Sequence, residues 1–282
     1  MPPMSWIESA SAGNWTLFVV TFLAVATWES FRPVRPLTSP AGQRWGRHGI
    51  LYLICGILMT ATFRITPVLL AVASVNNRFG LLNREWIPFA LRFAATLIIL
   101  DLVRYAVHRL FHSVYFLWRV HEVHHSDPEY DVSTAGRFHP IEVILEQGSQ
   151  LAIILLLAPP PLAVFVSGLL TIVLNLFVHA NAFLPGWAEQ ILRMVFITPG
   201  MHRIHHSEDI KEQTRNLGQT FAWWDRLFGT YSDQPQAGEA GLITGIKGLQ
   251  NEGSLGLGFM LAEPFQSRPQ PQADPVLTRP GL

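Results

Sequence analysis

The chain has 282 residues with 20 basic and 20 acidic side chains, so its formal net charge is zero. Only 14% of the residues are charged, against roughly 25% in soluble domains, and 49% are hydrophobic. This composition argues against a soluble enzyme, a disordered chain and a nucleic-acid-binding protein, which would need a basic excess. The single cysteine, Cys55, excludes an intramolecular disulfide and any cysteine-based zinc or iron–sulfur site.

Long apolar segments predict an all-α fold, specifically an integral-membrane helical bundle. Residues 9–28 carry no charge and are about as long as one bilayer span. The next segment, 49–77, is interrupted by Arg64 and Pro67, so it is either one kinked span or two short interfacial pieces. Residues 86–107 predict a further span despite the charges within it.

The longest apolar segment, 147–179, predicts a helical hairpin. It is uncharged, and the three consecutive prolines at 159–161 cannot continue a helix. A hairpin returns His179 to the side of the membrane that carries the other histidines, whereas a single crossing would separate them. Basic residues after the first and third spans place that side in the cytoplasm by the positive-inside rule.

Residues 232–282 are predicted to form a C-terminal tail that is partly disordered. The tail is rich in Gly, Pro and Gln, and its end, from Gln266 onward, contains four prolines. The domain organisation expected is therefore one membrane-bound domain, residues 1–231, followed by this tail.

Histidine is the most informative residue type in the chain. Ten of the eleven histidines lie between residues 108 and 206, in the clusters HRLFH (108–112), HEVHH (121–125) and HRIHH (202–206), with His139 and His179 isolated between the last two. Positions i, i+3 and i+4 of a helix share a face, so each cluster presents two or three imidazoles in one direction. A pH-responsive surface is a poor alternative, because packed imidazoles repel when protonated. Neutral imidazole binds iron, zinc, copper and nickel, and nine or ten histidines exceed one tetrahedral site, so two metals are expected.

The chain must bend between the first two clusters. His112 and His121 are nine residues apart and would lie on opposite faces of an unbroken helix, so a bend is expected around residues 113–115. The first cluster then extends the third span into a cap outside the membrane. Asp101, two helical turns before His108, either orients the helix that carries His108 or pairs with a neighbouring arginine.

Six motifs together resemble the fatty acid hydroxylase / sterol desaturase superfamily of integral-membrane di-iron enzymes. The similarity covers roughly residues 95–231. The motifs are HRLFH, HEVHH, STAGRFHPIE (133–142), NLFVHAN (175–181), TPGMHRIHHS (198–207) and WWDRLFGTY (223–231). The resemblance implies a helical bundle whose cytoplasmic helical cap holds a histidine-rich dimetal site, in a bacterial inner membrane.

The resemblance also implies which residues bind the two irons. Carried over position by position, the ligands are His108, His112, His121, His124, His125, His179, His202, His205 and His206. Some members have a further histidine one turn before His179, where this chain has Asn175, which would contact a metal through water or hydrogen-bond a neighbour. His139 would either supply a tenth ligand or start and orient a helix.

The implied activity is O₂-dependent hydroxylation, with desaturation as a variant, of a C–H bond in a membrane lipid. The chain contains no segment that resembles a fused electron carrier, so a separate donor must supply the electrons. The segment HHSDPEYDVSTAGR (124–137) somewhat resembles the branch of ether-lipid-cleaving, pterin-dependent monooxygenases, which is one alternative. A histidine-rich membrane metal transporter is the other. No catalytic residue beyond the metal ligands, no substrate-binding residue and no oligomeric state is predicted.

Overall fold

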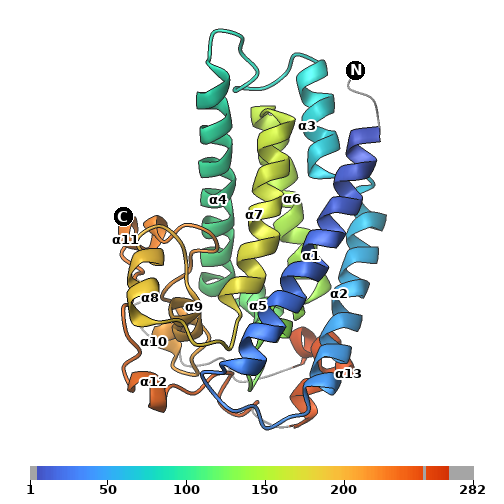
Figure 1. Ribbon diagram of the computed structural model, residues 1–282. Helices are drawn as coiled ribbons and strands as arrows, with labels where there is room; N and C mark the ends of the chain where they lie inside the picture. Colours follow the sequence, from blue (N-terminus) through green and yellow to red (C-terminus); the bar gives the residue numbers. More distant parts are fainter. Residues whose placement is uncertain (1–4, 250–251, 267–282) are drawn as a thin grey trace.

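The computed structural model describes residues 5–249 and 252–266, and of residues 5–13 only the backbone (Figure 1). Within these ranges the chain is helical or irregular, and three isolated bridges occur in place of strands. The predicted all-α class is therefore confirmed for the described residues.

Six helices form a bundle with α7 at its centre (Figure 1). They are α1 (Ser5–Phe31), α2 (Ala41–Phe63), α3 (Pro67–Asn76), α4 (Phe89–Ser113), α6 (Pro140–Leu157) and α7 (Pro161–Val178). Helix α7 packs against α1, α3 and α4, while α3 and α4 also pack against α6. The central helix thus touches both the N-terminal helix and the helix that carries the first histidine cluster.

Among the described residues, three segments are long and apolar enough to cross a membrane: Ala41–Asn76, which joins α2 to α3, and helices α6 and α7. The first is kinked, because Arg64 takes a left-handed conformation and Pro67 begins α3 after the Thr66 N-cap. Side chains such as Ile57, 69% exposed, face outward from α2, as lipid contact requires.

The remaining two predicted spans lie in α4, which does not meet the same criterion, and in α1, which is only partly described. Helix α4 contains the predicted span 86–107 except for its first three residues, but Arg92, Asp101 and Arg104 make it too polar. The predicted span 9–28 lies within α1, whose first residues lack described side chains.

The prolines at 159–161 lie at the junction of α6 and α7. Helix α6 ends at Leu157, Ala158 takes a left-handed conformation, and Pro161 is the first residue of α7. The segment after α3 packs against this junction, where Leu82 N–H donates to the Leu157 carbonyl at 2.8 Å.

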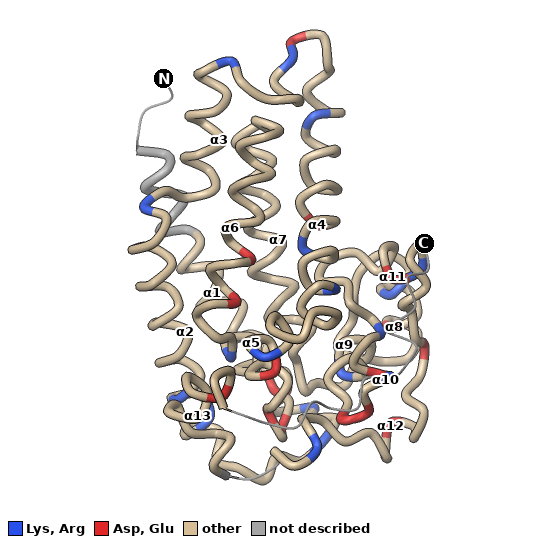
Figure 2. Tube along the Cα trace, turned by 180° about the vertical axis from the view of Figure 1, so that it is seen from behind, with Lys and Arg blue, Asp and Glu red and all other residues tan. Residues whose placement is uncertain are grey.

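The shorter helices gather at one end of the bundle and form what we call the cap (Figure 1). They are α5 (Tyr115–His125), η1 (Val132–Gly136), α8 (Gly186–Leu192), α9 (Pro199–His205), α10 (Ile210–Gln213), α11 (Trp223–Leu227), α12 (Gly238–Gly241), η2 (Glu252–Leu255), α13 (Leu257–Ala262) and η3 (Glu263–Phe265). Charged residues concentrate in the cap and in the loop at the opposite end, with few on the helices between (Figure 2). This distribution is typical of a protein whose middle lies in a bilayer.

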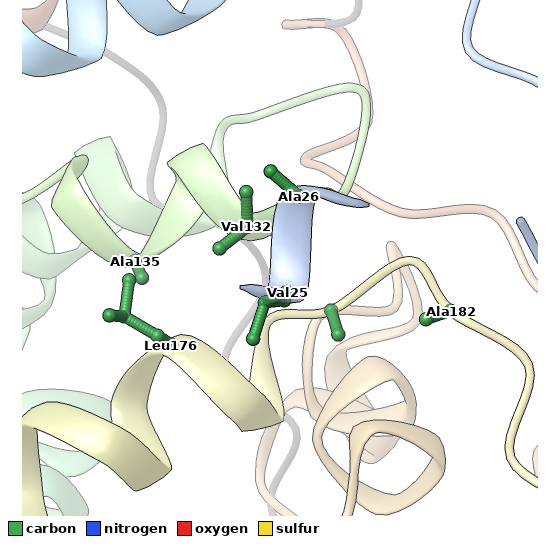
Figure 3. Close-up of a cluster of buried hydrophobic side chains, with 7 residues drawn as sticks. Val25, Ala26, Val132, Ala135, Leu176 and Ala182 are labelled. Carbon is green, nitrogen blue, oxygen red and sulfur yellow. The ribbon is translucent and has the colours of Figure 1, made fainter. Parts of the chain in front are cut away.

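The cap is joined to the bundle by a buried apolar cluster and by backbone hydrogen bonds to the buried Glu29. Val25 of α1, Val132 and Ala135 of η1, and Leu176 of α7 pack together (Figure 3). Beside them the Glu29 carboxylate accepts hydrogen bonds from the backbone N–H groups of residues 132 and 181, both at 3.1 Å. These contacts fix the loop after the second histidine cluster against the bundle.

The described part of the C-terminal segment packs on α5. Met260 is fully buried against Leu51, Cys55 and Val123, and Glu263 forms a 3.0 Å ion pair with Arg119. The predicted disorder from Gln266 onward falls, apart from Gln266 itself, outside the described residues.

Candidate metal centre

Nine histidines form two adjacent groups in the cap, each with its ring nitrogens within 4.8 Å of one another. The first group has five members, His108, His112, His121, His125 and His205, and the second has four, His124, His179, His202 and His206. These are the nine positions that the sequence singled out. Helix α4 supplies His108 and His112, α5 supplies the second cluster, and α9 supplies His202 and His205. His179 and His206 are the C-cap residues that follow α7 and α9.

Helix geometry explains how the clusters divide. In every cluster the residues at i and i+4 share a group: His108 with His112, His121 with His125, and His202 with His206. The residue at i+3 of each HxxHH cluster points about 100° away from the one at i+4, and it joins the other group. The bend after Ser113, where Val114 is extended between α4 and α5, turns the second cluster toward the first.

Hydrogen bonds fix the protonation of two rings in the five-histidine group. His108 Nδ1–H donates to the Leu217 carbonyl at 2.7 Å, and His205 Nδ1–H donates to the Arg215 carbonyl at 2.9 Å. A neutral imidazole with its proton on Nδ1 presents a lone pair at Nε2. These two Nε2 atoms are only 3.1 Å apart, so two lone pairs face each other. A cation between them removes that repulsion.

His121 brings a third ring nitrogen to the same place. Its Nδ1 lies 2.5 Å from Glu142 Oε1, and its Nε2 lies 3.1 Å from the Nε2 atoms of both His108 and His125. A carboxylate behind a histidine orients the ring and raises its basicity, which is the usual arrangement behind metal-binding imidazoles.

The four-histidine group is built in the same way. His179 Nδ1–H donates to the Asn175 carbonyl at 2.7 Å, which leaves its Nε2 as an acceptor. That Nε2 lies 3.2 Å from the Nε2 atoms of His124 and His202. The His206 ring completes the group, with its centroid 4.6 Å from that of His124.

All nine rings are neutral at physiological pH. Burial lowers the pKa of His108 and His179 to about 4. Burial and neighbouring histidines lower the pKa of the other seven rings well below the ordinary value. Neutral imidazole is the form that binds metals.

The nitrogen spacing and the donor set fit metal ions. Two nitrogens that each lie about 2.1 Å from a metal are about 3.0–3.4 Å apart at octahedral or tetrahedral angles. The observed Nε2–Nε2 separations of 3.1–3.2 Å fall in that range. Within the described residues, the buried Nε2 atoms of His112 and His206 also have no hydrogen-bond partner. An all-nitrogen donor set suits iron, zinc, copper or nickel rather than magnesium or calcium.

The three further candidates, His139, Asn175 and Asp101, lie outside both groups. His139 is the N-cap of α6, where its Nδ1 accepts from Ile141 N–H at 3.2 Å, as the helix-starting alternative predicted. Asn175 donates through Nδ2 to the Ala135 carbonyl at 3.1 Å, the alternative in which it bonds a neighbour.

Asp101 lies on α4, the helix that carries His108, and it interacts electrostatically with Arg104. Its Oδ2 accepts hydrogen bonds from Trp224 Nε1 at 2.9 Å and from Phe221 N–H at 3.2 Å. The aspartate therefore ties α4 to the loop that precedes α11, because these donors approach it from the cap.

Glu142 is the residue that the sequence analysis missed. It lies in the first turn of α6, 2% exposed, and its partner His121 is 21 residues away in the chain. An acid in the first turn of an apolar helix was a local signal, although helix N-termini favour acids for other reasons. The backbone carbonyls behind His108 and His205 had no signal at all, since any residue supplies one.

A cavity of about 100 Å³ reaches both histidine groups from the bundle. Its lining comprises His108, His121, His124, His179 and His202 together with Phe138, Glu146, Thr171, Asn175, Val178, Gln219 and Thr220. Helices α4, α6 and α7 supply the part of the wall that lies toward the membrane-spanning segments.

Comparison with known proteins gives the family. Residues 93–230 match the model of the fatty acid hydroxylase family. The chain is 33% identical over 185 residues to the ornithine lipid hydroxylase OlsE of Rhizobium tropici, a match that covers 65% of this chain and 53% of that protein. It is 31% identical over 134 residues to an alkylglycerol monooxygenase of Caenorhabditis elegans, covering 46% of this chain and 25% of that one.

A third relative is sphinganine C4-monooxygenase 1 of Arabidopsis thaliana, 30% identical over 152 residues, with 52% of this chain and 56% of that protein covered. The chain thus spans about a quarter to just over half the length of these relatives. No solved structure matches the chain significantly. The family match, the monooxygenase relatives and the membrane-type helical bundle with its buried histidines agree: residues 93–230, which carry all nine histidines, form a domain of the fatty acid hydroxylase / sterol desaturase superfamily.

Proposed function

We propose that this protein is an O₂-dependent hydroxylase of a membrane lipid that holds one iron in each histidine group. The observation that carries the proposal is the convergence of lone pairs in the five-histidine group. The Nε2 atoms of His121 and His205 each lie 3.1 Å from His108 Nε2, and none of the three carries a proton. When bound, two irons supply the two-electron activation of O₂ that breaks an unactivated C–H bond. The family and the named activities of the relatives support this choice of metal and reaction.

The protein's own groups prepare the site in three ways. Glu142 and the three backbone carbonyls hold ring nitrogens in place from behind, so the metal-facing nitrogens are preorganised. Eight of the nine rings are buried and His112 is half-buried, which limits the access of water. The cavity lets one carbon of a lipid approach both groups from the bundle side.

The placement proposed is an integral membrane protein of a bacterial inner membrane with the cap in the cytoplasm. The three apolar candidate spans and the concentration of charge in the cap support membrane insertion. We also propose residues 1–231 as the catalytic domain, and a separate protein or small reductant as the electron donor.

Ether-lipid cleavage with a pterin as the reductant is the second candidate. Alkylglycerol monooxygenases of worm, fish, human and frog match the chain at 27–31% identity over about half its length. A metal transporter is disfavoured, because the histidines are enclosed in the cap and the named relatives are hydroxylases and monooxygenases.

The test is the metal content of protein purified without oxygen, followed by O₂ consumption. We expect about two irons per chain, and O₂ uptake on addition of lipid and reductant. His124→Ala should lose the second iron and the activity. The matched control His139→Asn should keep both, because asparagine can still cap α6. Stoichiometric zinc from iron-replete cells, with no O₂ uptake, would refute the proposal.

The lipid substrate and the electron donor are identified together, by comparing two combinations of substrate and reductant. An ornithine lipid with reduced ferredoxin is compared with 1-O-hexadecylglycerol and a tetrahydropterin, and products are identified by mass spectrometry. Oxidation of the ornithine lipid supports the leading candidate, and release of an aldehyde from the ether supports the second.

A further inference from the structure

A groove runs along the outside of α4, where this helix enters the cap. Its lining includes Tyr105, Ala106, Arg109 and Ser113 of α4, together with Phe228, the residue that follows α11. Residues three, four and seven positions apart lie on one side of a helix, so these α4 side chains form one continuous wall. The lining contains none of the nine histidines, so the groove is separate from the metal centre.

The wall of the groove is mostly apolar and exposed. The Phe228 ring stacks on that of Tyr105, with the ring centroids 5.3 Å apart, and still has 44% of its surface exposed. Leu110, another lining residue, is also exposed, as are Trp223 and Leu227 on α11 itself. Exposed apolar side chains that gather in this way mark a surface that contacts a membrane or another molecule.

The groove lies where the apolar part of the bundle meets the charged cap. Leu102 and Tyr105 belong to the predicted span 86–107, whereas Arg109 and Ser113 lie beyond its end. Few charges occur on the bundle helices above this level, and many occur in the cap below it (Figure 2). Tyr and Trp side chains are typical of the boundary between hydrocarbon and headgroups, so this position favours contact with lipid.

Arg109 places a positive charge at the cap end of the groove. Its side chain is exposed, and its guanidinium hydrogen-bonds the Tyr105 hydroxyl, which also lies 2.9 Å from Thr230 Oγ1. Among the residues that the structure describes, Arg109 forms no ion pair. A guanidinium has five N–H donors and binds phosphate through two of them, so donors remain for an anion.

We propose that this groove binds an anionic phospholipid that is not the substrate. Arg109 pairs with the headgroup phosphate, and one acyl chain lies along Ala106 and Phe228 toward Leu102, which is ~10 Å deeper along α4 at 1.5 Å per residue. A free phosphate would leave the apolar wall uncovered, and a zwitterionic lipid would bring its own cation to Arg109. The bound lipid joins α4 to α11 and goes beyond the proposed oxidation chemistry.

The first test measures lipid binding to the purified protein by native mass spectrometry. Dioleoyl phosphatidylglycerol is titrated onto the wild type, onto Arg109→Gln and onto Ala106→Phe, in which a larger side chain fills the groove. The dissociation constant of the tightest lipid should rise about tenfold in both variants, the usual effect of losing a hydrogen bond to a charged group or a buried hydrocarbon segment. Lys211→Gln is the matched control, since it removes an exposed cap charge outside the groove, and it should bind as the wild type does. Wild-type affinity in either groove variant overturns the inference.

The second test uses only the wild type and distinguishes the possible occupants. Dioleoyl phosphatidylglycerol is compared with dioleoyl phosphatidylcholine, and with glycerophosphoglycerol, which has the same headgroup but no acyl chains. Tighter binding of phosphatidylglycerol than of both supports the inference. Equal binding of phosphatidylcholine removes the role of charge, and equal binding of glycerophosphoglycerol indicates a phosphate site without a lipid. Either result, or a dimer of this chain that excludes the lipid, overturns the inference.

The third test locates the lipid. Phosphatidylglycerol that carries a diazirine in one acyl chain is cross-linked to the protein at one lipid per chain, and the labelled peptides are mapped. Labelling should fall on residues 102–113 or on the segment that contains Phe228, and it should be lost in Arg109→Gln. Labelling elsewhere, or labelling that the variant retains, overturns the inference. None of the three readouts requires iron or O₂, so they decide the lipid site even if the proposed function fails.

Discussion

Replacing Glu142 by glutamine should weaken one metal site and spare the other. The Glu142 Oε1 atom lies 2.5 Å from His121 Nδ1, and both side chains are 2% exposed, so water does not screen the interaction. Glutamine keeps the shape and one acceptor atom but removes the negative charge. His121 then becomes a weaker ligand, and its ring is held less firmly.

The expected size of the effect follows from comparable sites. Losing the carboxylate behind a metal-binding histidine costs about 10- to 100-fold in metal affinity, which corresponds to about 1.4–2.8 kcal/mol. His121 belongs to the five-histidine group. In the four-histidine group, the ring of His179 is held by a backbone carbonyl, which this substitution does not change. The loss should therefore be confined to one of the two metals.

The assay is chelator competition on anaerobically reconstituted protein, with metal counted per chain. We expect the Glu142→Gln variant to fall from two metals to one at a chelator concentration that leaves the wild type fully loaded. The matched control is Glu146→Gln, the same chemical change one turn along α6, where the carboxyl group lines the cavity and hydrogen-bonds Gln219. Wild-type affinity for both metals in the Glu142 variant would refute the reasoning.

Three further predictions concern stability. Gly80→Ala should lower the free energy of unfolding by at least about 2 kcal/mol, because Gly80 has φ +102° and a new Cβ would lie 2.4 Å from that of Ala158; a thermal unfolding midpoint in detergent within a degree of wild type would contradict this. Glu263→Ala should cost about 2 kcal/mol, since the buried Arg119 loses one carboxylate and keeps Glu122 and the carbonyls of residues 263 and 266. Denaturant unfolding of the detergent-solubilised variant measures the change, and a free energy of unfolding equal to that of wild type would contradict it. In protein stripped of metal by a chelator, stability should fall as the pH drops from 6.5 toward 4, because rings such as His108 bind protons in that window only when unfolded; a midpoint that is constant across the window would count against neutral, buried rings.

Local sequence signals anticipated much of this protein. The spacing of the three clusters identified nine histidines, all of which meet in the structure, because i, i+3 and i+4 positions project from one side of a helix. The nine-residue gap from His112 to His121 required a bend, and α4 ends at Ser113. Three consecutive prolines cannot continue a helix, and α6 ends just before them while α7 begins at the third.

The tertiary structure decided what depends on partners far away in the chain. It divided the histidines into groups of five and four, and it placed Glu142 behind His121 and the Leu217 carbonyl behind His108, 109 residues away. It also made the Trp224 indole N–H a hydrogen-bond donor to Asp101, 123 residues away in the chain. Periodicity along one helix reports which side chains share a face, but it carries no information about which face of another helix will meet them. Residue types and spacing thus determined that this chain gathers imidazoles at the end of a membrane bundle, and packing alone determined how they are grouped and what orients them.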